Sequence, residues 1–156
     1  LGLWEKPDTA GGHSMGWRTP IHELKDTILE ACERFTVVEI ACDPWRLEET
    51  LANLAEMGLP VVEFSTNSTQ RMTQATQLAF DKIINGELSH TGDPALIRHF
   101  NNAVLREDPK RGSRLTKERK GSSKKINAAI ASIIALHRAT FYQEASAPPE
   151  AQLLVL

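Results

Sequence analysis

Apolar residues recur along the chain at helical and at strand-like spacings, and the two patterns alternate. Apolar positions three or four apart between residues 24 and 32 predict an amphipathic helix over 20–34. Residues 36–42 are β-branched and mostly apolar, which is typical of a buried strand. That strand must end at Asp43-Pro44, because proline lacks a backbone donor and restricts the residue before it.

The alternation continues along the chain and indicates an α/β domain. Apolar residues at helical spacing predict a helix that starts at Leu47 and ends at Gly58. A second strand over 59–64 follows it. Strand, helix and strand in so short a stretch predict a β-α-β unit with a parallel strand pair. The remaining expected elements are helices over 69–85, 94–102 and 124–141, a short extended piece over 87–90 and a strand over 103–106. The apolar stripe expected to bury the helix over 69–85 consists of Met72, Ala75, Ala79 and Ile83.

Charge changes this picture, because the basic residues are concentrated in one segment. The chain of 156 residues has a formal net charge of -2. Between Arg106 and Lys125 stand nine Lys or Arg against three acids, a net of +6 that leaves −8 for the rest of the chain. We call residues 106–125 the basic segment and expect it to form a hairpin or loop. Such asymmetry favours an anionic partner, although a solvated charged loop would show the same composition.

Composition excludes several classes of function. The spacing of Cys32 and Cys42 fits no zinc site, and both are expected to be small buried residues. The five histidines are scattered, and His90 and His99 are interpreted as surface or packing residues. No phosphate-binding glycine-rich loop, serine nucleophile motif or membrane-length apolar run is present.

Two positions are candidates for metal chemistry. Asp43 follows a predicted strand, and sites in α/β sheets form beyond the carboxyl ends of strands. Asn127 lies in the first turn expected for the last helix, where its amide oxygen would be a weaker, neutral ligand. The structural alternatives are a polar residue that closes a strand and an ordinary polar residue in a first helical turn.

A series of short motifs, taken in order and spacing, resembles the C-terminal nuclease domain of the large terminase subunit of tailed double-stranded DNA phages. No single motif is specific, and the resemblance covers about residues 3 to 140. The motifs are Trp4-Glu5-Lys6-Pro7, Trp17-Arg18-Thr19-Pro20, Glu39 to Arg46, Gly58 to Phe64, Leu88 to Pro94, Asn101 to Asp108, Arg114 to Lys117 and Lys124 to Ala131.

The resemblance implies an RNase H-like fold, a mixed sheet flanked by helices, in a nuclease domain over 1–141 with a tail over 142–156. It implies an endonuclease that uses two Mg²⁺ or Mn²⁺ ions to cut concatemeric DNA during packaging. Asp43 matches a metal-binding carboxylate of the family, and Asn127 matches its last acidic position. The basic segment would hold duplex DNA without reading bases. The residues expected to do so are Arg114, Lys117, Arg119, Lys120, Lys124 and Lys125.

The chain departs from the family pattern in two ways. It starts at Leu1, so we expect it to be N-terminally truncated, without the strand that carries the first catalytic Asp and without the ATP-using domain. Asn127 is an amide where the family has a carboxylate, so the fragment alone is expected to be weak or inactive unless Asp108 or Glu118 substitutes. The alternative is a catalytically impaired domain, as in a decaying prophage, that serves as a DNA- or portal-docking module.

The resemblance also implies partners and a location. The partners are double-stranded DNA, the portal and the small terminase subunit, with no membrane. The location is the bacterial host cytoplasm and, transiently, the procapsid portal.

The second alternative function is an unrelated small nucleotide-binding enzyme. Such an enzyme would need a glycine-rich strand-to-helix turn, which the chain lacks.

Overall fold

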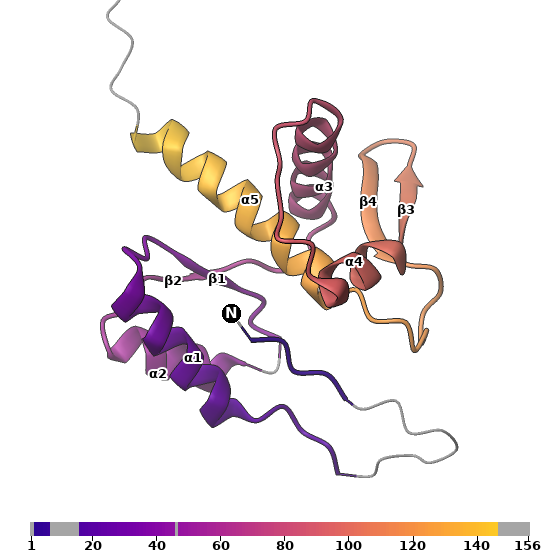
Figure 1. Ribbon diagram of the computed structural model, residues 1–156. Helices are drawn as coiled ribbons and strands as arrows, with labels where there is room; N and C mark the ends of the chain where they lie inside the picture. Colours follow the sequence, from indigo (N-terminus) through magenta and orange to yellow (C-terminus); the bar gives the residue numbers. More distant parts are fainter. Residues whose placement is uncertain (1, 7–15, 46, 147–156) are drawn as a thin grey trace, which may run out of the picture. The chain divides into compact units, whose positions relative to one another are not determined.

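The computed structural model describes residues 2–6, 16–45 and 47–146, which form two compact units (Figure 1). The first unit is Leu1–Glu63 and the second is Phe64–Leu156. The expected tail over 142–156 lies outside the described residues from 147 onwards. None of the helices in the described part of the chain has the length and hydropathy needed to cross a membrane.

The first unit is built on the predicted β-α-β arrangement. Its elements are α1 (Ile21–Arg34), β1 (Ile40–Cys42), α2 (Glu48–Glu56) and β2 (Val61–Glu63). The two strands pair in parallel, with Ile40 opposite Val61 and Cys42 opposite Glu63. The strand expected over 36–42 is therefore shorter. The amide of Ile40 donates to the carbonyl of Pro60, and Pro60 has no amide of its own to extend the ladder.

Helix α2 carries the buried residues of the first unit, with Leu51 and Leu54 6% and 1% exposed. It ends at a left-handed Gly58, whose φ is 80°. The amide of Gly58 donates to the carbonyl of Ala55, and the amide of Leu59 donates to that of Leu54. These two bonds are the Schellman pattern, and they satisfy carbonyls at the helix end. The prediction that Gly58 ends this helix is confirmed.

The cysteines are less buried than the sequence analysis expected. Cys32 and Cys42 are both free and only half-buried. Helix α1 has no fully buried residue, so Cys32 lies on a helix that the first unit covers only in part. The expectation that both cysteines are buried was therefore wrong.

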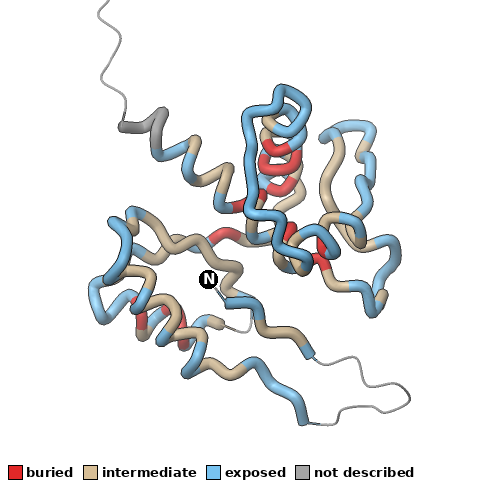
Figure 2. Tube along the Cα trace, in the orientation of Figure 1, coloured by how far each residue is buried: buried red, intermediate tan, exposed pale blue. Residues whose placement is uncertain are grey.

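The second unit packs α3 against α5 and adds an antiparallel hairpin. Its elements are α3 (Thr69–Ile84), α4 (Pro94–Asn101), β3 (Ala103–Asp108), β4 (Gly112–Lys117) and α5 (Asn127–Ser146). Most of its buried residues lie on α3 and on the first half of α5, which are coloured red in Figure 2, and Phe64 and His99 are buried as well. The hydroxyl of Thr76 accepts a hydrogen bond from the amide of Leu115 at 3.0 Å. This bond ties the edge of β4 to α3.

Two expectations for the second unit need correction. Ile83 is 53% exposed, because burial on α3 ends at Ala79 and leaves the last turn uncovered. Helix α5 begins at Asn127 rather than at 124, because the amide of Lys124 donates a hydrogen bond to the hydroxyl of Ser122 in a turn before the helix.

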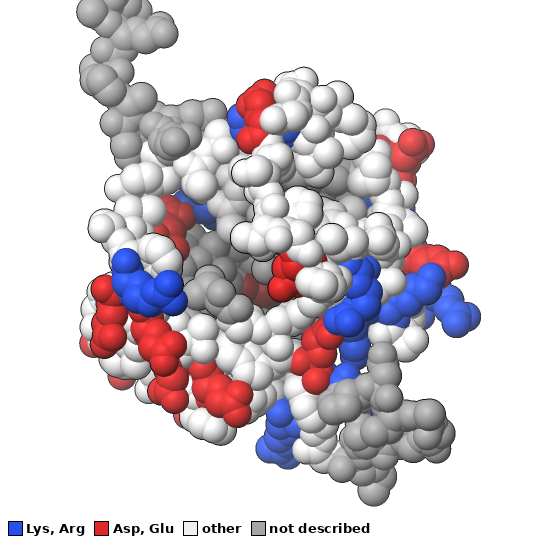
Figure 3. All heavy atoms as spheres, in the orientation of Figure 1, with Lys and Arg blue, Asp and Glu red and all other residues white. Residues whose placement is uncertain are grey.

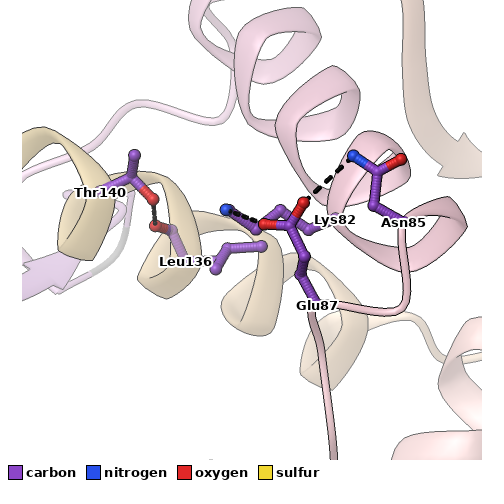
Figure 4. Close-up of polar contacts among 5 residues, drawn as sticks. All are labelled: Lys82, Asn85, Glu87, Leu136 and Thr140. Atoms are coloured by element: carbon purple, nitrogen blue, oxygen red, sulfur yellow. Dashed lines mark hydrogen bonds and ion pairs between the residues drawn. The ribbon is translucent and has the colours of Figure 1, made fainter.

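The far end of α3 is closed by a polar cluster on the surface. Lys82 and Asn85 both donate to the carboxylate of Glu87, and Gly86 in between adopts a φ of 68° (Figure 4). These hydrogen bonds, together with the charge of Lys82, lower the pKa of Glu87 from its ordinary value. The same view shows Thr140 donating to the carbonyl of Leu136 on α5.

The α/β class is confirmed. Both strand orientations occur in the described residues, as a parallel pair (β1-β2) and an antiparallel pair (β3-β4) in two separate sheets. The expectation of a hairpin in the basic segment is also confirmed, because β4 and the end of β3 lie within it. The strand expected over 103–106 extends to Asp108, since ladder pairing continues through charged residues up to the turn.

Candidate functional site

Asp43 lies directly beyond the carboxyl end of β1, as predicted. Its side chain is half-buried, and its Oδ1 atom accepts a hydrogen bond from the amide of Trp45 at 3.0 Å. This local turn fixes the carboxylate, because Pro44 between the two residues has a restricted φ. The loop after β1 therefore holds one carboxylate in a defined orientation.

The pKa of the Cys42 thiol depends in part on the Asp43 carboxylate beside it. Burial raises the pKa of Cys42, and the charge of Asp43 raises it further. The thiol donates to the carbonyl of Asp43 at 3.6 Å.

Glu63 is a candidate functional residue that the sequence analysis did not name. It is the last residue of β2 and lies opposite Cys42 in the parallel register. Because parallel strands end at the same edge, the backbone of Glu63 lies beside the strand end that leads to Asp43. The signal in the sequence was a carboxylate at the end of the second predicted strand.

Asn127 is the first residue of α5, and its side chain is exposed. The chain around it is held by His99 of α4 and by Asn102, the C-cap residue of that helix. Nδ1 of His99 accepts a hydrogen bond from the amide of Ala128 at 2.8 Å, and the Asn102 amide group donates to the carbonyl of Lys125 at 3.0 Å. His99 is thus more than the packing residue that was expected, since it caps the helix that carries Asn127.

The two candidate ligands belong to different units, and the structure places each within its own unit. No group of three or more His, Cys, Asp or Glu side chains within residues 2–6, 16–45 and 47–146 is arranged to hold a metal ion. Asp108 and Glu118, the possible substitutes, both have local partners. Asp108 accepts from the amide of Lys110, and Glu118 pairs with Lys124 at 3.5 Å.

The basic segment spreads over the hairpin and the stretch before α5. On the face drawn in Figure 3, Lys and Arg side chains gather around that stretch. Three of the expected DNA contacts are exposed, namely Arg119, Lys120 and Lys124. The other three are half-buried, namely Arg114, Lys117 and Lys125. Lys117 donates to the carbonyl of Ser122 at 3.1 Å, so part of its function is to close this loop.

Comparisons with known proteins point to one family. Residues 17–143 match the family model described as terminase large subunit, endonuclease domain. Among solved structures, the chain is similar to the large terminase of bacteriophage HK97, with a TM-score of 0.65 and 23% sequence identity. That similarity covers 76% of this chain and 24% of the phage protein, so the chain spans about a quarter of its length. No curated protein matched the chain.

Proposed function

Because the chain belongs to the family of terminase large subunit endonuclease domains, we propose that in the intact protein it is part of a metal-dependent endonuclease that cuts double-stranded phage DNA during packaging. The observation that carries this proposal is Asp43, a fixed carboxylate beyond the carboxyl end of β1 in a domain of this family. The proposed partners are duplex DNA, the portal and the small terminase subunit, in the host cytoplasm and at the procapsid portal.

The donor atoms present fit a divalent metal ion in type and fall short in number. Asp43 and Asn127 offer oxygen atoms, which Mg²⁺ and Mn²⁺ prefer. They bring one negative charge, whereas a pair of ions normally shares several carboxylates. We therefore assign this chain part of a ligand set, to be completed by an upstream acid. Two bound ions would supply an activated water and charge stabilisation at the leaving 3′ oxygen.

The chain's own residues have separable roles in this proposal. Asp43 holds a metal, with its orientation set by the amide of Trp45. Position 127 faces solvent at the start of α5, where His99 and Asn102 fix the backbone. The exposed cations Arg119 and Lys120 contact DNA phosphates without reading bases.

A second function is favoured by the amide at position 127. An amide cannot contribute charge to a metal site, so the chain would bind ions poorly and could serve as a DNA- or portal-docking module. In this alternative the basic segment still binds DNA, and the domain does not catalyse cleavage. An Asn127→Asp variant separates the two functions, because it adds a charge at a solvent-facing position where a carboxylate needs no new space.

Mn²⁺ titration of isotope-labelled chain, followed by NMR line broadening, tests the role of Asp43. We expect broadening around residues 42–45 in wild type, a stronger effect in Asn127→Asp and none in Asp43→Ala. Asp26→Ala is the matched control, since Asp26 is an exposed acid of α1 in the same unit. Broadening that persists in Asp43→Ala refutes the assignment.

Plasmid cleavage with Mn²⁺ tests the same residues in the protein extended upstream. Cleavage should be lost in Asp43→Ala and raised in Asn127→Asp.

A further inference from the structure

Two arginines lie directly opposite each other on the β3-β4 hairpin. The antiparallel register pairs Arg106 with Arg114. Residues in such a pair share one face of the sheet, with Cβ atoms about 5 Å apart. Like charges in this arrangement destabilise a hairpin, so the pair calls for a compensating anion or a function.

No carboxylate neutralises this pair in the structure. Within the described residues, neither arginine forms an ion pair. Glu107 alternates to the opposite face of β3. Asp108 shares the face of Arg106, but its Oδ1 accepts from the amide of Lys110 in the hairpin turn and it forms no ion pair with either arginine. The first turn of α3, which Arg114 reaches, contains no acidic residue.

The two guanidinium groups differ in how they are held. Nη1 of Arg114 donates to the hydroxyl of Thr69 at 3.4 Å, and its side chain is half-buried. Arg106 is exposed on the outer strand. The hairpin itself is anchored, because the amide of Leu115 donates to Thr76 on α3. One cation is therefore fixed in place, and the other is free to close over a ligand.

We propose that Arg106 and Arg114 form a clamp for one phosphodiester group of the DNA backbone, an inference that rests on the DNA binding proposed above. A planar guanidinium donates two parallel hydrogen bonds to phosphate oxygens. Two guanidinium groups on one face can share one phosphate, whose charge then offsets their mutual repulsion. The clamp contacts no base and adds no sequence preference. It adds Arg106, a residue outside the set first expected to bind DNA, and assigns Arg114 a specific ligand.

Binding of a fluorescent duplex oligonucleotide by the 156-residue chain, measured over a range of salt concentrations, tests the clamp. We expect Arg106→Gln and Arg114→Gln each to weaken binding about tenfold. Each should also reduce the slope of log affinity against log salt by about 0.9, the value for one phosphate. The double variant should bind about as well as either single variant, because both arginines serve the same phosphate.

The control is Lys110→Gln, which removes the same charge from the exposed hairpin turn. It should weaken binding less than either arginine variant. Arg106→Gln should melt no lower than Lys110→Gln, because it relieves repulsion and breaks no contact. Arginine variants that match Lys110→Gln overturn the clamp, and so does a double variant whose slope falls by about 1.8, the value for two separate phosphates. A wild-type chain that binds no duplex would instead overturn the proposed DNA binding itself.

Discussion

The Nδ1 atom of His99 lies 2.8 Å from the backbone nitrogen of Ala128 and accepts its hydrogen bond. His99 is completely buried at 0% exposed, on the face of α4 that packs against α5. The bond satisfies one of the amides at the start of α5 that have no partner within the helix. The side chain of a neighbouring helix thus does what a local capping residue normally does, and it fixes where Asn127 stands.

Replacing His99 should therefore destabilise the second unit in a way that depends on the acceptor. His99→Leu leaves the half-buried amide of Ala128 without its hydrogen-bond partner, and we expect a loss of about 1 kcal/mol in unfolding free energy. His99→Asn places an oxygen where Nδ1 stands and should lose less than His99→Leu. Urea denaturation followed by circular dichroism measures both. Equal losses in the two variants would mean that volume, and not the hydrogen bond, determines the effect.

The thiol of Cys42 should report the charge of Asp43. The Asp43 carboxylate contributes to the raised pKa of Cys42, because a nearby negative charge disfavours the thiolate. Asp43→Asn removes that charge, so the pKa should fall, although it stays above its ordinary value because burial is the larger cause. The pH dependence of alkylation at Cys42, read by mass spectrometry in a Cys32→Ser background, measures the shift. Asp26→Asn serves as control and should leave the profile unchanged.

The sequence predicted those features that depend on neighbouring residues. The spacing of apolar residues located α1 through α4, and Asp43-Pro44 and Gly58 were correctly expected to end a strand and a helix. The start of α5 depends only in part on neighbouring residues, because His99 and Asn102 also hold it from across the fold, and it was therefore expected too early. The same reason explains why Glu63 was missed, since its place beside the end of β1 follows from the parallel register.

Glu87 gives the stability of α3 a dependence on acid pH. Its pKa is lowered in the folded chain by Lys82 and Asn85, so its contribution is present above the ordinary pKa and is lost as pH falls through the folded value. Glu87→Gln should be slightly less stable than wild type near pH 7, and the difference in stability should be smaller at about pH 3. Urea unfolding at the two pH values measures this. Glu107→Gln, an exposed acid of β3, is the matched control and should show no such convergence.

The exposed cations before α5 should dominate the salt dependence of DNA binding outside the clamp. Arg119 and Lys120 are both exposed, whereas Lys117 is held by the carbonyl of Ser122. Each phosphate contact contributes about 0.9 to the slope of log affinity against log salt, so Arg119→Gln combined with Lys120→Gln should lower the slope by up to about 1.8. Lys25→Gln on α1 removes a charge far along the sequence from the basic segment and should leave the slope unchanged. If the double variant keeps the wild-type slope, Arg119 and Lys120 do not contact DNA.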